Sequence, residues 1–265
     1  MLEVLKEHKD FGRTIYKLAK VDLIKTYRGS ALGWAWAIIK PTVTILVYWF
    51  TFSVGLRAPS FIEGYPYFLW LISGIIPWFY MSEMLTQGTE AIRGYRHLVT
   101  KMTFPVSTIP TFVSLSKMFV HLCMVGIVIL IFILTGYPPD IYLIQLPVYI
   151  VMMYILFTAW ALFASPLAAI SKDFANLVKS FITALFWMSG VIWDPSNISN
   201  PLAQLFFKIN PITYLSMGYR NSFIYKKWFF DDPETLIYFS IVTVIMITLG
   251  VVMYKRLRKD IPDVL

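Results

Sequence analysis

Six stretches of the chain are long and apolar enough to cross a lipid bilayer, and this feature restricts the fold more than any other. A hydrocarbon core roughly 30 Å thick requires about 20 apolar residues in a helix. Backbone polar groups in lipid must pair within the segment, which favours helices as the spanning form. The sequence therefore predicts an all-α integral membrane protein with six transmembrane helices over residues 31–56, 67–87, 109–135, 141–170, 174–193 and 236–254.

Composition supports one membrane domain over residues 1–265, since 58% of the residues are hydrophobic and only 14% are charged. The net charge of +8 does not indicate nucleic-acid binding, because the charges flank apolar spans instead of forming one basic face. Cys123 is the only cysteine, which excludes an intrachain disulfide and a thiolate metal cluster. We expect an interface helix in residues 1–28, spans one to five in 31–193, outer helices in 194–233, and span six with a cytoplasmic tail in 234–265.

The distribution of cationic residues predicts the orientation in the membrane. Sixteen of the 23 Lys and Arg residues lie in segments 1–30, 88–105, 171–180 and 255–265, which share one side of the predicted membrane. The opposite side carries five, namely Arg57, Lys208, Arg220, Lys226 and Lys227. Since cytoplasmic loops are enriched in Lys and Arg, we expect a multi-pass protein of the cell inner (cytoplasmic) membrane with both termini in the cytoplasm.

The N-terminal segment is charged and lacks the apolar core of a signal peptide. Phe11, Ile15 and Leu18 follow helical spacing among six lysines and arginines between residues 6 and 25. This pattern favours a basic amphipathic helix that lies along the cytoplasmic face of the membrane, where anionic lipids attract cations. A frayed, solvated tail is the alternative.

The predicted outer segment, residues 194–233, contains two helix-start signals, Asn200-Pro201 and Asn210-Pro211. Asn caps a helix N-terminus, and Pro is favoured at the first helical position. The expected helices, 201–209 and 211–225, are too short to span the bilayer and too apolar for an ordinary loop. We therefore expect two short re-entrant or interfacial helices that form an outer lid; two ordinary surface helices are the alternative.

The sequence contains no motif for catalysis or metal binding. It has no GxxxxGK[ST] phosphate loop, no HExxH, no paired-cysteine zinc spacing, and its three histidines are scattered. Glu83, Lys117 and Lys179 are charges within spans, which usually face protein or water, but three isolated charges do not form a proton relay. We therefore expect no catalytic residue, metal or cofactor in this chain, and active transport would take its energy from another subunit.

Three regions resemble the permeases of type-2 ABC exporters for polysaccharides and polyol phosphates. They are residues 27–41 (YRGSALGWAWAIIKP), residues 74–79 (GIIPWF) with 98–105 (LVTKMTFP), and residues 210–214 (NPITY) with Tyr219-Arg220. Each motif is weak alone, but their order and spacing cover nearly the whole chain. Within this family the chain most resembles the O-antigen exporter permeases of the Wzm type, and the teichoic acid exporter permeases are close relatives.

The resemblance implies a homodimer that works with two copies of a separate ABC ATPase, which would bind ATP and Mg²⁺. A cytoplasmic coupling segment would seat in that ATPase through Arg93, Tyr95, Arg96, His97, Leu98 and Lys101. The outer gate would comprise Asn210, Pro211, Tyr214, Tyr219 and Arg220. The substrate would be a lipid-linked polysaccharide threaded between the two protomers.

Aromatic side chains are suited to a moving glycan, since sugar C–H faces pack on rings while Tyr and Trp add hydrogen-bonding groups. Arg28 and Lys40, at the predicted cytoplasmic mouth, are candidates for pairing with a lipid pyrophosphate. The alternative for the aromatic side chains is a belt at the membrane interface. The alternative for the two cations is snorkelling to lipid phosphates. The candidate channel aromatics are Trp34, Trp36, Tyr48, Trp49, Phe52, Trp187 and Trp193.

Two other classes of protein fit the sequence less well than an exporter permease. A membrane-embedded enzyme for lipid-linked sugars would need convergent acidic or histidine residues, and the cluster Asp231, Asp232 and Glu234 stands alone. A type-2 ABC permease for drugs or lipids is disfavoured by the aromatic content and by the resemblance. Composition alone does not exclude it.

Overall fold

A computed structural model describes residues 2–56, 60–101, 104–195 and 198–264. Arg57, counted above among the outer charges, lies outside these residues, as does the side chain of Lys101. The described chain is almost entirely helical, apart from a two-stranded antiparallel hairpin, β1 (Phe61–Ile62) and β2 (Tyr65–Pro66). This result agrees with the predicted all-α class.

The long helices follow the apolar stretches closely. They are α2 (Trp36–Phe50) with the π-turn Thr51–Gly55, α3 (Tyr67–Glu83) with the π-turn Met84–Gly88, α6 (Thr108–Leu134), α7 (Leu146–Ile170) preceded by the 3-10 turn Ile141–Gln145, and α11 (Pro233–Leu257). Among the described residues, the five segments containing these helices are long and apolar enough to cross a membrane.

The fifth predicted span, residues 174–193, differs from expectation. Its helix α8 covers Lys172–Trp187, only 16 residues, and the chain turns after it. Gly190 has a positive φ of 62°, which is incompatible with a continuing α-helix. Arg220 binds the carbonyls of Gly190 and Val191, so side-chain hydrogen bonds from a distant helix replace the helical ones.

The Asn-Pro signals mark helix starts, as predicted. Helix α9 (Pro201–Ile209) begins where the Asn200 side chain accepts hydrogen bonds from the backbone N–H groups of Leu202 and Ala203. Helix α10 (Pro211–Arg220) begins in the same way, with Asn210 accepting from Ile212, and a π-turn, Asn221–Tyr225, follows it.

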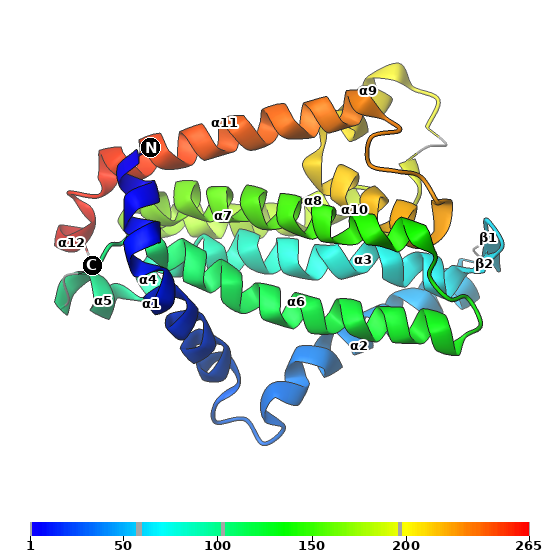
Figure 1. The fold of residues 1–265 in the computed structure, drawn as a ribbon, viewed down its shortest axis with the longest axis horizontal. Coiled ribbons are helices and arrows are strands. Elements are labelled where there is room, and N and C mark those ends of the chain that lie inside the picture. Colours follow the sequence, from blue (N-terminus) through cyan, green and yellow to red (C-terminus); the bar gives the residue numbers. More distant parts are fainter. Residues whose placement is uncertain (1, 57–59, 102–103, 196–197, 265) are drawn as a thin grey trace.

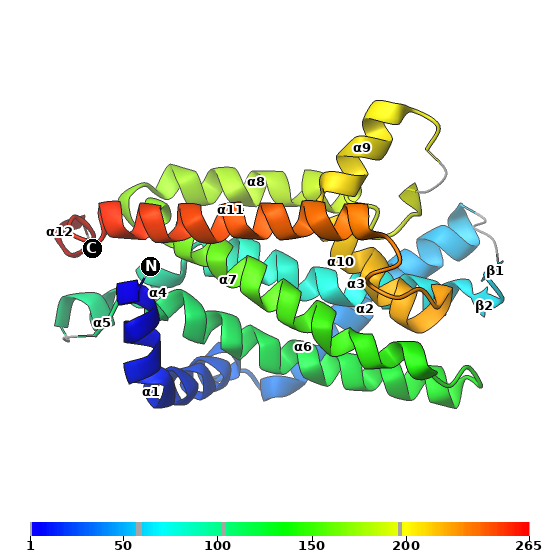
Figure 2. The same ribbon diagram turned by 45° about the horizontal axis from the view of Figure 1, so that its top comes forward.

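Helix α3 occupies the centre of the bundle. In its most apolar stretch, 78% of the residues are buried, whereas the corresponding share is 6% for the span that contains α2 and 11% for α11. Helices α6 and α10 pack directly on α3, and α7 packs against both α6 and α11. Figures 1 and 2 show α2 and α11 on the outside of this bundle.

Both ends of the chain lie at one end of the bundle, together with α4 (Ala91–Gly94), α5 (Arg96–Lys101) and α12 (Ile261–Val264) (Figure 1). The hairpin and α9 lie at the opposite end. This placement agrees with the predicted grouping of the termini and the segment 88–105 on one side.

The N-terminal segment forms the predicted helix, α1 (Leu2–Tyr27), which runs across the long axis of the bundle (Figures 1 and 2). Its inner face packs on α6 through Ile15 and Ala19, next to Phe112. The contact with α6 therefore places α1 as a structural part of the bundle end and excludes a frayed tail.

Close approach of α11 to α7 requires a residue without a side chain at Gly250. A Cβ added there would lie 2.9 Å from the Ala159 carbonyl oxygen. We expect Gly250→Ala to destabilise the protein by about 1–3 kcal/mol, because the helices must separate. The midpoint of thermal unfolding in detergent measures this change.

Gly126→Ala in α6 is the matched control, since a Cβ there meets nothing within 4 Å. An unfolding midpoint for Gly250→Ala equal to that of Gly126→Ala would contradict the close packing of α7 and α11.

Candidate functional site

The predicted coupling segment forms two short helices, α4 and α5, at the same end as the termini. Tyr95 and Leu98 were predicted to contact an ATPase, but both point inward and are buried. They pack with Ile15 of α1 and Phe112 of α6. These two residues therefore fix the segment to the bundle and do not form its outer surface.

A polar contact ties the coupling segment to α1. The hydroxyl of Tyr95 donates a hydrogen bond to Oδ1 of Asp22, which is itself buried. The Lys25 ammonium lies 4.6 Å from the centroid of the Tyr95 ring. Burial raises the pKa of the Tyr95 hydroxyl well above its ordinary value, and Asp22 raises it further, so the phenol stays protonated and donating at neutral pH.

Arg93 and its neighbour Ile92 connect the segment to the other side of the bundle end. Arg93 donates to the carbonyl oxygen of Ala168 in α7, 3.3 Å away, and Ile92 packs with Ala169 and Ile261. Arg96 and His97 are exposed. Of the predicted coupling residues whose side chains are described, Arg96 and His97 thus lie where a soluble partner can reach them.

The predicted outer-gate residue Arg220 is completely buried, unlike an ordinary loop cation. Its guanidinium carbon lies 3.6 Å from the centroid of the Trp70 ring, and its Nη atoms donate to the carbonyls of Gly190 and Val191. Burial lowers the pKa of Arg220 to about 10, which leaves it charged at neutral pH. The ring face and two carbonyls compensate the buried charge.

The space for this guanidinium comes from Gly74 in α3. A Cβ at that position would lie 2.3 Å from Nη2 of Arg220. Trp70 is also held by its Nε1, which donates to the Tyr225 hydroxyl at 2.8 Å; that hydroxyl donates to Asp194 at 2.9 Å. The sequence does not identify Gly74 or Trp70 as a partner of Arg220, although Gly74 begins the GIIPWF motif and Trp70 lies four residues before it.

The other predicted gate residues also fasten α10 to its surroundings. Asn210 donates through Nδ2 to Oγ of Ser189 at 3.0 Å, and Tyr219 shares a 2.6 Å hydrogen bond with His121 of α6. Tyr214 stacks on Phe239 of α11 with ring centroids 4.8 Å apart. Pro211 occupies the first turn of α10. The structure therefore brings all five residues together around α10 as a packed unit.

The candidate channel aromatics divide into exposed and packed groups. Tyr48 stacks on Phe186 at 5.3 Å, Phe52 lies 6.4 Å from Tyr67, and Trp193 donates to the Trp187 carbonyl at 2.9 Å. The structure does not gather the whole set in one cavity, and Arg28 and Lys40 are both exposed near the start of the first span. The exposed aromatics lie on or beside α2 and on α8, and are Trp34, Trp36, Trp49 and Trp187.

Comparison with known proteins identifies the family. Residues 13–224 match the sequence model of the family described as "ABC-2 type transporter". The chain is 26% identical to the "O-antigen export system permease protein RfbA" of Myxococcus xanthus, with 99% of each chain covered. It is 20% and 21% identical to two proteins of the same name from Klebsiella pneumoniae, with 92% of each chain covered.

Removing the Tyr95 hydroxyl should loosen the bundle end. Tyr95→Phe leaves the buried Asp22 carboxylate without its donor, at a cost of about 1–3 kcal/mol. We expect faster amide hydrogen exchange in residues 2–27 and 91–101. Tyr16→Phe is the control, because Tyr16 is exposed on the same helix as Asp22; equal exchange in the two variants would refute the role of the bond.

Gly74→Ala should displace Arg220 from Trp70 and from the two carbonyls. Because the displaced guanidinium stays buried with fewer partners, we expect a loss of about 2 kcal/mol or more in unfolding free energy. The thermal midpoint of the purified protein measures it. Gly55→Ala, where a Cβ meets nothing within 4 Å, should unfold like the wild type. A thermal midpoint for Gly74→Ala equal to that of the wild type would contradict the close packing of Arg220 against Gly74.

Proposed function

Because the chain belongs to the ABC-2 type transporter family, we propose that it is the permease subunit of an exporter that moves lipid-linked polysaccharide of the O-antigen type outward across the cytoplasmic membrane. The observation that carries this proposal is the similarity, over 92% or more of the chain, to three permeases named for O-antigen export. The similarity to the Myxococcus xanthus protein covers 99% of the chain, which includes the bundle end that would meet an ATPase and the outer helices.

In this proposal the chain crosses the membrane six times. Helix α8 is about 24 Å long at 1.5 Å per residue, so in this proposal the turn residues that follow it complete the fifth crossing. An even number of crossings agrees with both termini at one end of the bundle. The Lys and Arg distribution supports a cytoplasmic location for that end.

The energy would come from two copies of a separate ABC ATPase, since this sequence contains no phosphate-binding loop. The exposed Arg96 and His97 would contact the ATPase. Tyr95, Leu98 and Arg93 would transmit its movement, because they join the segment to α1, α6 and α7. Movement of a docked segment is a recognised way to pass a nucleotide-driven closure to a second subunit.

A homodimer would place the glycan path between protomers. Helix α2 exposes an apolar face that includes Val43, Val47 and Phe50, and α8 exposes Leu177 and Phe181. Such faces suit either lipid or another copy of the chain. The exposed aromatics of α2 and α8 would then offer many weak, similar contacts to a moving sugar chain, while Arg28 and Lys40 would attract a lipid pyrophosphate.

If α4 and α5 contact the ATPase, a charge reversal on their exposed surface should weaken ATPase binding. Reversing the charge at Arg96 (Arg96→Glu) should reduce the ATPase that co-purifies with the permease about tenfold, because a rim charge sets complementarity with the partner. Lys172→Glu, an exposed lysine at the same end in α8, should leave co-purification unchanged.

The complex formed with wild-type permease should hydrolyse ATP faster when lipid-linked glycan is present, and the isolated permease should hydrolyse none. Nucleotide turnover by the isolated permease, or full ATPase binding by Arg96→Glu, would contradict the division of roles proposed above.

A further inference from the structure

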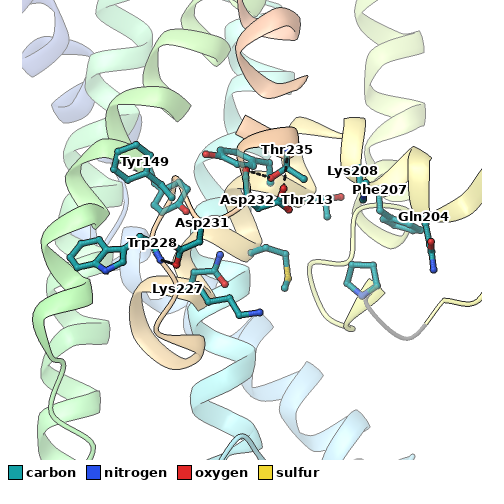
Figure 3. A pocket seen from close by; sticks show the side chains of 15 residues that line it. Tyr149, Gln204, Phe207, Lys208, Thr213, Lys227, Trp228, Asp231, Asp232 and Thr235 are labelled. Carbon is teal, nitrogen blue, oxygen red and sulfur yellow. Dashed lines mark hydrogen bonds between the residues drawn. The ribbon is translucent and has the colours of Figure 1, made fainter. Parts of the chain in front are cut away.

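A cavity of about 590 Å³ opens at the end of the bundle that carries α9 (Figure 3). Its walls come from the start of α7, from α9 and α10, from segment 226–232 and from the first turn of α11. This volume lies within the usual range for sites that hold a small ligand. The lining residues that carry the argument are Tyr149, Phe207, Tyr214, Trp228, Asp231 and Asp232.

The segment that forms one wall is held in place by hydrogen bonds and an ion pair. The Gln145 side chain donates to the Lys227 carbonyl and accepts from the Phe229 N–H, both at 2.7 Å. Lys226 pairs with Asp140 at 2.8 Å. The wall is therefore preformed, so a ligand would not have to order it.

Two carboxylates face this cavity with one oxygen each already engaged. Asp231 Oδ2 accepts from the Trp228 N–H at 2.8 Å, and Asp232 Oδ1 accepts from the Thr235 N–H at 3.3 Å. These bonds orient the carboxylates, and the second oxygen of each accepts no hydrogen bond from the described part of the chain. Lys208, also in the lining, is paired with Glu234 at 2.8 Å.

Aromatic rings supply the apolar part of the lining. The Trp228 ring is parallel to that of Phe230 to within 4°, with centroids 5.9 Å apart, and lies 4.9 Å from the ring of Tyr142. Phe207 is held edge-on by Trp193 at 5.1 Å. Fixed rings of this kind offer a flat apolar surface beside the acceptors.

The wall contains two neighbouring buried phenols. Tyr214 is only 9% exposed, and its ring centroid lies 5.7 Å from that of Tyr149. The Tyr214 hydroxyl has Tyr149 as its side-chain partner and makes no hydrogen bond of standard geometry within the described residues. A polar ligand against this wall would supply a well-aligned partner for this hydroxyl.

We propose that this pocket binds a neutral sugar unit, and, given the proposed function, that its ligand is part of the polysaccharide emerging from the membrane. The free carboxylate oxygens accept hydrogen bonds from sugar hydroxyls, and the rings receive the C–H face of the sugar. Glu234 neutralises Lys208, and Lys227 is the other cation in the lining, so Asp231 and Asp232 leave the pocket with a net negative charge. This charge disfavours phosphate or another anion and makes the pocket costly for an acyl chain. By holding the emerged part of the polysaccharide, the pocket would oppose movement of the polysaccharide back into the membrane between ATP cycles.

The test uses the permease–ATPase complex in lipid nanodiscs and short oligosaccharides released by mild acid from the surface polysaccharide of the source cells. Asp231→Asn combined with Asp232→Asn keeps the acceptors for Trp228 and Thr235 but removes both charges. We expect this double variant to bind the oligosaccharides at least about tenfold more weakly. Trp228→Phe, which reduces the ring surface, should also weaken binding.

Glu63→Gln is the control, because Glu63 is an exposed acidic residue between β1 and β2, outside the pocket. Retained co-purification of the ATPase separates lost binding from lost folding. Wild-type binding by both pocket variants, in a complex that exports glycan, would overturn the pocket assignment alone. A wild-type complex that neither binds nor exports glycan would overturn the proposed function and the pocket together.

Discussion

A polypeptide in hydrocarbon must satisfy its own backbone hydrogen bonds, and the architecture of this chain follows from that constraint. The long apolar helices satisfy it internally, so they can pack around α3 with few polar side chains. Irregular backbone occurs mainly at the two ends of the bundle, which is also where the candidate functional regions lie. The bundle therefore has regular helices in its middle, and its two ends are held by specific side-chain contacts.

Arg220 shows how an irregular segment is tolerated beneath the outer helices. The turn that ends α8 leaves carbonyls without helical partners, and the guanidinium binds two of them while its charge rests on Trp70. Gly74 is the residue that makes room. Movement of α10 would therefore displace contacts to α3 and to the turn after α8. A gate that is coupled to the membrane spans requires such a connection.

The sequence was sufficient for features that depend on local chemistry. Span positions followed from apolar length, and the starts of α9 and α10 followed from Asn-Pro capping. The early end of α8, the inward direction of Tyr95 and the burial of Arg220 depend on partners far away in the chain. The pocket joins residues from Tyr149 to Thr235, so no local pattern marks it. Its clearest signal in the sequence is the acidic cluster Asp231, Asp232 and Glu234, which by itself does not indicate a pocket.

We propose that this permease moves lipid-linked polysaccharide outward at the expense of ATP that a partner subunit hydrolyses. The most direct measurement is ATP-dependent movement of lipid-linked glycan across the membrane of vesicles that contain the purified complex, detected by a glycan-cleaving enzyme confined to one side. We expect transfer of the glycan away from the ATPase side, and this transfer should require both subunits and hydrolysable ATP. Transfer that does not need ATP, or a complex that hydrolyses ATP without moving glycan, would contradict it.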